Sequence, residues 1–315
     1  MPRHYRKTFL GLGALALAGA FAAPAIPAFA ASSPVTDARI VAHFDLAALQ
    51  QPENITLEPD GNADVTFAYA HQVARVTPQG KVTILATLPS AAAGTTAAAG
   101  IVRAPDGTLY VNYVDVGGTG AGIWRISPDG TAAPVAALPA AGFLNGLALD
   151  PGSGALFAVD SFGGTVWKVW PRTGKAEVWA SGPDLQPAAP GGFGANGLKV
   201  HDGSVWVSNT SRGTLLRIPV RPDGTAGSPV VVASGLPSID DFAFTGPGDT
   251  LLAVQNQLNQ ADLIAPDGTA RVVLTAADGL STPSAVAVRG RTVYVTSAAY
   301  YTEVDPNLLM AHLDR

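Results

Sequence analysis

The sequence predicts an all-β fold: a six-bladed β-propeller with four-stranded antiparallel blades, whose ring is closed by an N-terminal strand. Three observations predict this fold, namely a composition rich in turn residues, a sixfold internal repeat, and one strand-like segment outside the repeats. With 35 Gly and 25 Pro in 315 residues, 47% hydrophobic residues and 14% charged ones, the chain consists of short apolar segments separated by turns.

Residues 1–30 are predicted to be a secretory signal peptide. Three basic residues among the first seven precede the apolar stretch FLGLGALALAGAFAA, and the AFA at 28–30 is a small-residue cleavage site. We therefore expect cleavage after Ala30, a secreted protein, and a short linker over 31–37. An uncleaved membrane anchor is the alternative, but two prolines interrupt the stretch and no stop-transfer charges follow it.

The charge of the mature chain limits its partners. Without residues 1–30 it keeps 16 Lys and Arg against 24 Asp and Glu, a formal net charge of −8. Nucleic acids are bound by clustered basic side chains, so we expect no nucleic-acid partner. We also expect no membrane partner after cleavage of the signal peptide. The mature protein is expected to be a monomer that binds a small molecule. The chain has no Cys, which excludes disulfides and thiolate metal sites.

A repeat of 44 to 51 residues runs through the rest of the chain and indicates one four-stranded blade per unit. In the first unit the four strands are NITLE, DVTFAYA, QVARVTP and KVTILATL, each bounded by turn residues. The blades are expected to start near positions 53, 99, 145, 196, 240 and 284.

The sixth unit lacks a fourth strand after NLLMAHLDR. The segment ARIVAHFDLAA from Ala38 resembles the outer strand that begins at Lys81 and has no blade of its own. We therefore predict that residues 38–45 complete the blade built by residues 284–315, within a propeller domain over 38–315. Such closure removes an open sheet edge, which would otherwise favour aggregation.

The first residue of each blade is expected at the mouth of the central channel, on one face of the ring. These residues are Glu53, Ala99, Asn145, Asn196, Asp240 and Ser284. Four of the six carry carboxylate or amide oxygens, the hard ligands that Ca²⁺ prefers. The pattern predicts Ca²⁺ or another divalent cation at the channel mouth. The alternative is that these polar residues serve only as turn residues before strands.

The segments PENITLEPDG, LNGLALDP, ANGLKV and IDDFAF resemble the blade-start motifs of the gluconolactonase and regucalcin (senescence-marker-protein) family of six-bladed propellers. More distantly they are similar to diisopropyl-fluorophosphatases and paraoxonases. The resemblance implies that Glu53, Asn196 and Asp240 bind a divalent metal, usually Ca²⁺. It also implies that Asn145 contacts the metal or the substrate, and that Asp240 is the catalytic base or nucleophile. The chain departs from the sugar-lactone members at Phe143, where they usually have Arg.

Loops between the second and third strands return to the same face and supply candidate substrate contacts. The main candidates are His71, Tyr113, Asp160 and Asn209, and the others are Tyr69, Asp115, Ser161, Gln255, Asn256 and Tyr300. Their aromatic and amide groups suit a small neutral ester or lactone.

Two classes of function follow from these residues. The first is a secreted, Ca²⁺-dependent hydrolase of lactone, ester or phosphotriester bonds that uses Asp240. The second is a non-catalytic propeller of the NHL-like type, which binds a ligand or protein and holds at most a structural metal. A lyase or strictosidine-synthase-like enzyme is a weaker third alternative, because His71 is the only histidine expected near this face.

Overall fold

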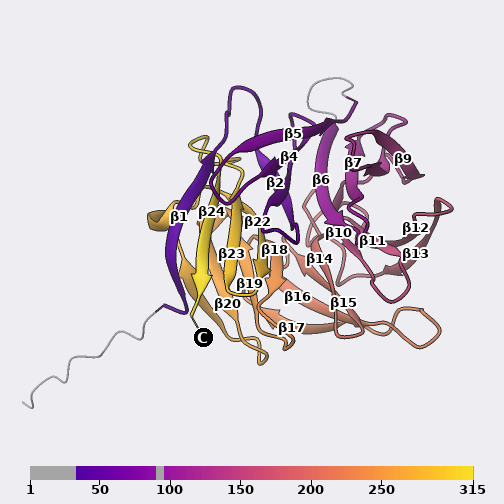
Figure 1. Cartoon of the computed structure of the whole chain (residues 1–315). Coiled ribbons are helices and arrows are strands. Elements are labelled where there is room, and N and C mark those ends of the chain that lie inside the picture. Colours follow the sequence, from indigo (N-terminus) through magenta and orange to yellow (C-terminus); the bar gives the residue numbers. More distant parts are fainter. Residues whose placement is uncertain (1–32, 90–95, 315) are drawn as a thin grey trace, which may run out of the picture. The chain divides into compact units, whose positions relative to one another are not determined.

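The computed structural model describes residues 33–89 and 96–314, and it confirms the predicted six-bladed propeller. Six four-stranded antiparallel sheets form a ring (Figure 1). The predicted signal peptide lies outside the described residues. Within the described part of the chain, no helix has the length and apolar character needed to cross a membrane.

Each blade consists of four strands that are consecutive in the chain, except the last. The first three blades are β2 (Pro52–Leu57), β3 (Ala63–Phe67), β4 (Gln72–Val76) and β5 (Val82–Thr87); β6 (Thr96–Arg103), β7 (Leu109–Asp115), β8 (Gly122–Ile126) and β9 (Ala132–Ala137); and β10 (Leu144–Leu149), β11 (Leu156–Asp160), β12 (Thr165–Trp170) and β13 (Lys175–Ser181). The next two are β14 (Ala195–His201), β15 (Ser204–Asn209), β16 (Thr214–Pro219) and β17 (Val230–Ser234); and β18 (Ile239–Phe244), β19 (Leu251–Gln255), β20 (Gln260–Ile264) and β21 (Ala270–Leu274). The sixth contains β22 (Pro283–Arg289), β23 (Thr292–Ser297) and β24 (Asn307–Leu313), and two short 3₁₀ helices, η1 (Asn256–Leu258) and η2 (Ala276–Asp278), lie in loops.

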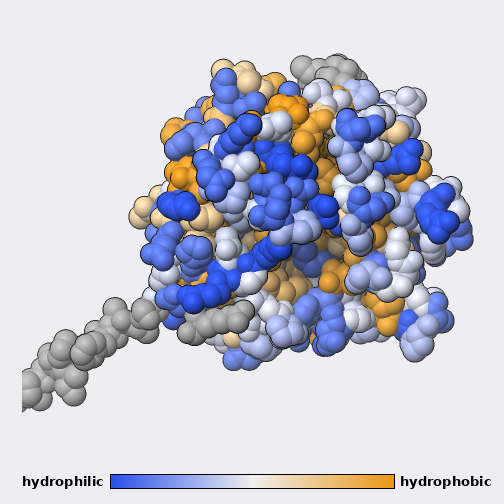
Figure 2. All heavy atoms as spheres, viewed as in Figure 1, coloured by the Kyte–Doolittle hydropathy of each residue, from blue (hydrophilic) through white to orange (hydrophobic). Residues whose placement is uncertain are grey.

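The first strands of neighbouring blades contact one another in the order β2, β6, β10, β14, β18, β22 and back to β2, so they line the centre of the ring (Figure 1). The apolar residues of each blade pack against the next blade, and six separate hydrophobic clusters result, one at each interface between blades. Burial between sheets is the main source of stability for such a ring. On the outside, Figure 2 shows polar and apolar side chains interspersed over the face in view.

An N-terminal strand closes the ring, as predicted. Strand β1 (Val35–His43) is the outermost strand of the sixth blade and pairs antiparallel with β24, from Val35 opposite Leu313 to His43 opposite Asn307. Figure 1 shows the indigo β1 beside the yellow β24. The strand begins three residues before the predicted 38–45, and Asp37 lies within it at a φ of 54°, where the pairing is irregular.

Candidate functional site

The six predicted blade-start positions all lie in β-bulges. In every blade the register between the first and second strands shifts at this point, for example between Pro52 and Asn54 in the first blade and between Ile239 and Phe242 in the fifth. A bulge leaves one residue unpaired and turns its side chain away from the alternation of the strand. Glu53 and Asp240 therefore owe their position to the bulges of β2 and β18.

In the described part of the chain, polar side chains connect neighbouring blades near these bulges at five of the six interfaces between blades. Asn112 Nδ2 donates to the backbone oxygen of Asn145 at 2.7 Å, and Ser208 Oγ donates to the backbone oxygen of Asp240. Equivalent bonds run from Thr66 Oγ1 to Ala99 O, from Ser161 Oγ to Ala195 O and from Ser284 Oγ to Pro52 O. Buried backbone oxygens need such partners, and here the partners fix the backbone from which the site residues project.

The repeated Asn-Gly-Leu string has a packing cause. A Cβ atom added to Gly146 would lie 2.4 Å from the backbone oxygen of Asn196, and one added to Gly197 would lie 2.8 Å from that of Asp240. Only glycine allows neighbouring inner strands to approach this closely. The glycines therefore bring the asparagines before them near the centre of the ring.

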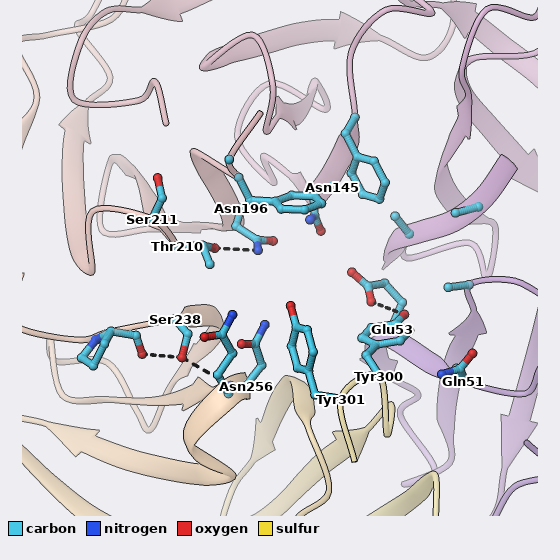
Figure 3. A pocket seen from close by; sticks show the side chains of 18 of the residues that line it. Gln51, Glu53, Asn145, Asn196, Thr210, Ser211, Ser238, Asn256, Tyr300 and Tyr301 are labelled. Carbon is cyan, nitrogen blue, oxygen red and sulfur yellow. Dashed lines mark hydrogen bonds between the residues drawn. The ribbon is translucent and has the colours of Figure 1, made fainter. Parts of the chain in front are cut away.

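Glu53 is a buried carboxylate with one oxygen already held. Tyr300 Oη donates to Glu53 Oε2 at 2.6 Å, and the carboxylate points toward the open space in Figure 3. Burial raises the pKa of Glu53 from 4.5 to about 7, the hydrogen bond from Tyr300 opposes the rise, and the charge of Asp241 adds to it. Burial and the neighbouring Glu53 raise the pKa of Tyr300 as well, so Tyr300 stays a donor.

Asp240 lies in a similar environment on the fifth blade. Its pKa is raised well above the usual value, first by burial and then by the charge of Glu53, while a hydrogen bond from Asn256 lowers it. That bond runs from Asn256 Nδ2 to Asp240 Oδ2 at 3.0 Å. Two carboxylates with like charge are thus buried close enough to affect each other, an arrangement that is costly without a compensating cation.

The amide oxygens beside these carboxylates lack protein partners. Asn196 Nδ2 donates to Thr210 Oγ1 at 2.8 Å, and among the described residues its buried Oδ1 has no hydrogen-bond partner. The buried Oδ1 of Asn256 has none there either. Asn145 is 4% exposed and also lies at the open space (Figure 3). Buried acceptors without a protein partner are rare, and those of Asn196 and Asn256 are available to bind a ligand.

These residues fit a hard divalent cation. Two uncompensated carboxylates and unpartnered amide oxygens are the donor set that Ca²⁺ takes. Within the described part of the chain, no group of three or more His, Cys, Asp and Glu side chains could hold a metal ion. The predicted site therefore depends on amide oxygens from Asn145 and Asn196 in addition to Glu53 and Asp240.

A cavity of about 1140 Å³ opens above the blade starts (Figure 3). Glu53, Asn145 and Asn196 line it, whereas Asp240 does not and lies behind Asn256, which does. The rest of the lining is mainly aromatic and apolar; it includes Leu46, Leu49, Tyr69, Phe143, Phe193, Tyr300 and Tyr301. The cavity slightly exceeds the usual range of small-molecule sites, which is roughly 300–1,000 Å³.

The four main predicted substrate contacts lie elsewhere. His71 bonds to Thr96, Tyr113 donates to the backbone of Pro89, and Asn209 donates to two backbone oxygens of the loop at 184–186. Asp160 Oδ1 accepts three backbone N–H groups, those of Phe143, Phe162 and Gly163. None of the four lines the cavity. Their observed contacts shape the loops, and direct substrate contact stays a prediction for them.

Other cavity residues escaped the sequence analysis. Phe193, Thr210 and Tyr301 line the cavity, and of these Phe193 belongs to the loop before β14 rather than to a loop between second and third strands. Three of the other candidates from the sequence analysis do line the cavity: Tyr69, Asn256 and Tyr300. The aromatic residue in GGFGANG is the one sequence signal that could have identified Phe193.

Comparison with known families gives one match. A model of the family described as "Repeat of unknown function (DUF6923)" matches residues 61–238, more than half of the 315-residue chain. No curated protein matches the sequence.

Several solved structures share the fold. A gluconolactonase from Xanthomonas campestris is 18% identical with a TM-score of 0.64, over 90% of this chain and 98% of that one. A virginiamycin B lyase from Staphylococcus aureus is 16% identical with a TM-score of 0.59, over 84% and 81%. A PQQ-bound aldose sugar dehydrogenase from Streptomyces coelicolor is 17% identical with a TM-score of 0.62, over 90% and 100%. These likenesses support the six-bladed propeller fold and do not extend to a particular member of the gluconolactonase and regucalcin family.

Proposed function

Because the chain belongs to the family described as a repeat of unknown function (DUF6923), we propose its activity from the site itself. The protein is a secreted hydrolase of small neutral lactones or esters that depends on a divalent cation, with Ca²⁺ as the preferred ion. One observation carries the proposal: Glu53 and the unpartnered amide oxygen of Asn196 lie at a large cavity, with the buried carboxylate of Asp240 behind the lining residue Asn256, and the pKa values of both carboxylates are raised. Similarity to a gluconolactonase structure is consistent with it.

Glu53, Asn145, Asn196 and Asp240 would hold the cation. When bound, the cation supplies a positive charge that polarises the carbonyl oxygen of the substrate. Tyr300 keeps Glu53 in place through Oε2, and Thr210 orients the Asn196 amide by accepting from its Nδ2. These contacts leave oxygens of both side chains free for the cation.

Asp240 is the base in this proposal. It takes a proton from the water that attacks the carbonyl carbon, and it returns that proton to the leaving oxygen as the carbon–oxygen bond breaks. Asn256 holds Oδ2 of Asp240 at 3.0 Å and thereby positions the carboxylate. Burial raises the pKa of Asp240, and a carboxylate with a higher pKa is a stronger base.

The test is hydrolysis of a panel of lactones and aryl esters by the purified protein. EDTA should abolish activity and added Ca²⁺ should restore it, while Asp240→Asn should lower kcat by about 100-fold or more. Calorimetric titration of the EDTA-treated protein should show Ca²⁺ binding that Glu53→Gln removes. Full activity of the metal-free wild type would refute the proposal.

Glu303→Gln is the matched control. Glu303 lines the same cavity but is exposed at its rim, so this variant removes the same charge as Glu53→Gln without touching the blade starts. Ca²⁺ affinity and turnover should stay close to those of the wild type. An equal loss in both variants would indicate a general electrostatic effect rather than a defined cation site.

The alternative is a non-catalytic, ligand-binding propeller in which a cation has only a structural role. It is favoured by one observation, that Asp240 does not line the cavity. Ca²⁺ binding that depends on Glu53, with no hydrolysis of any substrate in the panel, would support this alternative. A lyase has less support, since no histidine is found among the described residues that line the cavity.

A further inference from the structure

Three phenylalanines form a cluster beside the two cavity asparagines. The ring centroids of Phe143 and Phe193 lie 5.1 Å apart at an interplanar angle of 83°, and Phe162 lies 5.5 Å from Phe143 and 5.3 Å from Phe193. Phe143 precedes Asn145 by two residues and Phe193 precedes Asn196 by three. Of the three, Phe143 and Phe193 line the cavity. We call these two side chains the phenylalanine wall.

Hydrogen bonds to the backbone of the loops fix the position of the phenylalanine wall. Asp160 Oδ1 accepts the backbone N–H groups of Phe143 and Phe162 at 2.9 and 3.0 Å, and the backbone oxygen of Phe193 accepts from Ser211 N at 3.0 Å. Side chains that select one ligand over another need such support, because an unsupported loop would shift when the ligand binds.

The wall is nonetheless left open to water. Phe193 is 37% exposed and Phe143 is partly exposed, although both are large apolar side chains, and the neighbouring Phe162 outside the wall is 40% exposed. Across the cavity, Tyr69 and Tyr301 are 43% and 63% exposed, and Tyr69 packs edge-on against Tyr300 with ring centroids 5.7 Å apart. When a ligand covers apolar groups at the mouth of a cavity, their removal from water favours binding by roughly 25 cal/mol per Å² of apolar surface buried.

The charged side chains that line the cavity do not favour a ligand with an anionic group beside the phenylalanine wall. Among the described residues, the lining has one basic side chain, Arg212, and two acidic ones, Glu53 and Glu303. Arg212 Nε donates to the backbone oxygen of Gln186, so part of its guanidinium belongs to the loop. A carboxylate or phosphate on the ligand would find little compensation here.

From these observations we infer that the substrate carries an uncharged apolar arm, an aryl or acyl chain, and that the phenylalanine wall selects it. The ester or lactone centre is taken from the proposed function, whereas the arm follows from the wall itself. The carbonyl end would lie at the cation that Glu53, Asn145 and Asn196 hold in the proposed function, and the arm covers Phe143 and Phe193. Such a ligand accounts for both halves of the cavity, which is larger than a lactone ring requires.

The test uses two lactams, which resist hydrolysis: 2-pyrrolidinone, and 5-octyl-2-pyrrolidinone with an eight-carbon arm. Calorimetry with the purified protein in Ca²⁺ buffer should show the octyl lactam binding more tightly by about 30-fold or more. Phe143→Ala and Phe193→Ala should each weaken its binding about tenfold and change 2-pyrrolidinone by less than about twofold. Phe193→Leu, which keeps an apolar side chain, should retain most of the affinity.

Val230→Ala is the control, because Val230 is exposed on the outer strand β17, away from the cavity lining. Phe193 is partly exposed, so its variants should melt close to the wild type, and this shows that lost binding is not lost folding. The inference is overturned if the octyl arm adds no affinity, or if both Phe→Ala variants bind it like the wild type.

Failure of the arm and failure of the proposed activity give different results. Hydrolysis of unsubstituted and octyl-substituted lactones at equal kcat/KM would overturn the apolar arm and leave the hydrolase intact. Tight, phenylalanine-dependent binding of the octyl lactam with no turnover of any lactone or ester would support the arm and remove the hydrolase.

Discussion

Asp240 and Asp241 are neighbours in the chain and both are buried, yet their surroundings differ completely. The two carboxylate oxygens of Asp241 lie 2.6 and 2.7 Å from Lys199 Nζ, and Asn54 Nδ2 donates to one of them at 3.3 Å. Asp240 has Asn256 as a donor and the like charge of Glu53 nearby. One carboxylate is neutralised by the protein, and the other is left for a ligand.

The difference follows the geometry of the bulge. Asp240 and Asp241 both lie in the bulge of β18; Asp240 has the position that Glu53 has in the first blade, and Asp241 the position of Asn54, one residue later. Asp241 and Asn54 are the more deeply buried layer of the two. The two layers therefore have separate roles: the upper layer supplies free oxygens, and the lower layer ties the blades together. Four experiments can test or refine this separation.

The largest effect is expected from Lys199→Met. Removing the ammonium leaves Asp241 buried without its counter-charge, which should lower the free energy of unfolding by about 3 to 5 kcal/mol in urea titrations. Adding Asp241→Asn to this variant should recover most of the loss. Asp240→Asn alone should cost no stability in EDTA, and a loss as large as that of Lys199→Met would contradict the two-layer description.

The pH dependence of stability should be the next largest effect. The pKa of Glu53 is raised to about 7 in the folded protein, so its contribution is favourable below pH 4.5 and is lost as the pH rises through 7. In EDTA the protein should therefore lose about 3 kcal/mol of stability between pH 4.5 and pH 8, measured from melting curves. Ca²⁺ should remove this trend, and Glu53→Gln should reduce it to the part that Asp240 contributes, because burial raises the pKa of Asp240 as well. A cation-free wild type with constant stability over this range would contradict the assignment.

Glycine substitutions test how tightly the lower layer is packed. A Cβ at position 197 would lie 2.6 Å from Asp241 Oδ1, so Gly197→Ala should destabilise the fold by about 1 to 3 kcal/mol. Gly248→Ala is the control, because a Cβ there meets nothing within 4 Å. Equal melting temperatures for the two variants would show that the inner strands can move apart.

The smallest effect on folding is expected from Thr210→Val. The substitution removes the acceptor for Asn196 Nδ2, which costs about 1 kcal/mol of stability, and it frees the amide to rotate. Ca²⁺ affinity should then fall by about tenfold in calorimetry, because residues that orient a metal ligand affect affinity more than stability. Unchanged Ca²⁺ affinity would mean that Asn196 is not a ligand held in this way.

The repeat allowed the fold and the face of the site to be predicted before any coordinates. The same position in the repeat is occupied by Glu53, Asn145, Asn196 and Asp240. Each blade has this repeat because the inner strands pack against one another around the ring. The closing strand was predictable for a similar reason, because a sheet edge without a partner had to be matched by a strand without a blade.

Loop side chains could not be predicted in the same way. Asp160 and Asn209 were expected to face the substrate; in the structure Asp160 Oδ1 accepts the backbone N–H of Phe143, and Asn209 Nδ2 donates to the backbone oxygen of Asp184, both in loops distant in the sequence. Direct substrate contact stays a prediction for both residues. Those contacts depend on the individual loop path and leave no periodic signal. The pairing of Asp241 with Lys199 joins two blades across 42 residues and is likewise absent from any local pattern.

The pairing of β1 with β24 also determines when, during synthesis of the chain, the propeller ring can close. Asn307 follows its partner His43 by 264 residues, so at a synthesis rate of 5–20 residues per second β1 waits about 10 to 50 s for the strand that covers it. Every other blade can assemble from strands made in immediate succession. The ring is thus completed by the oldest and the newest parts of the described chain, and until they meet the first strand made remains open to other partners.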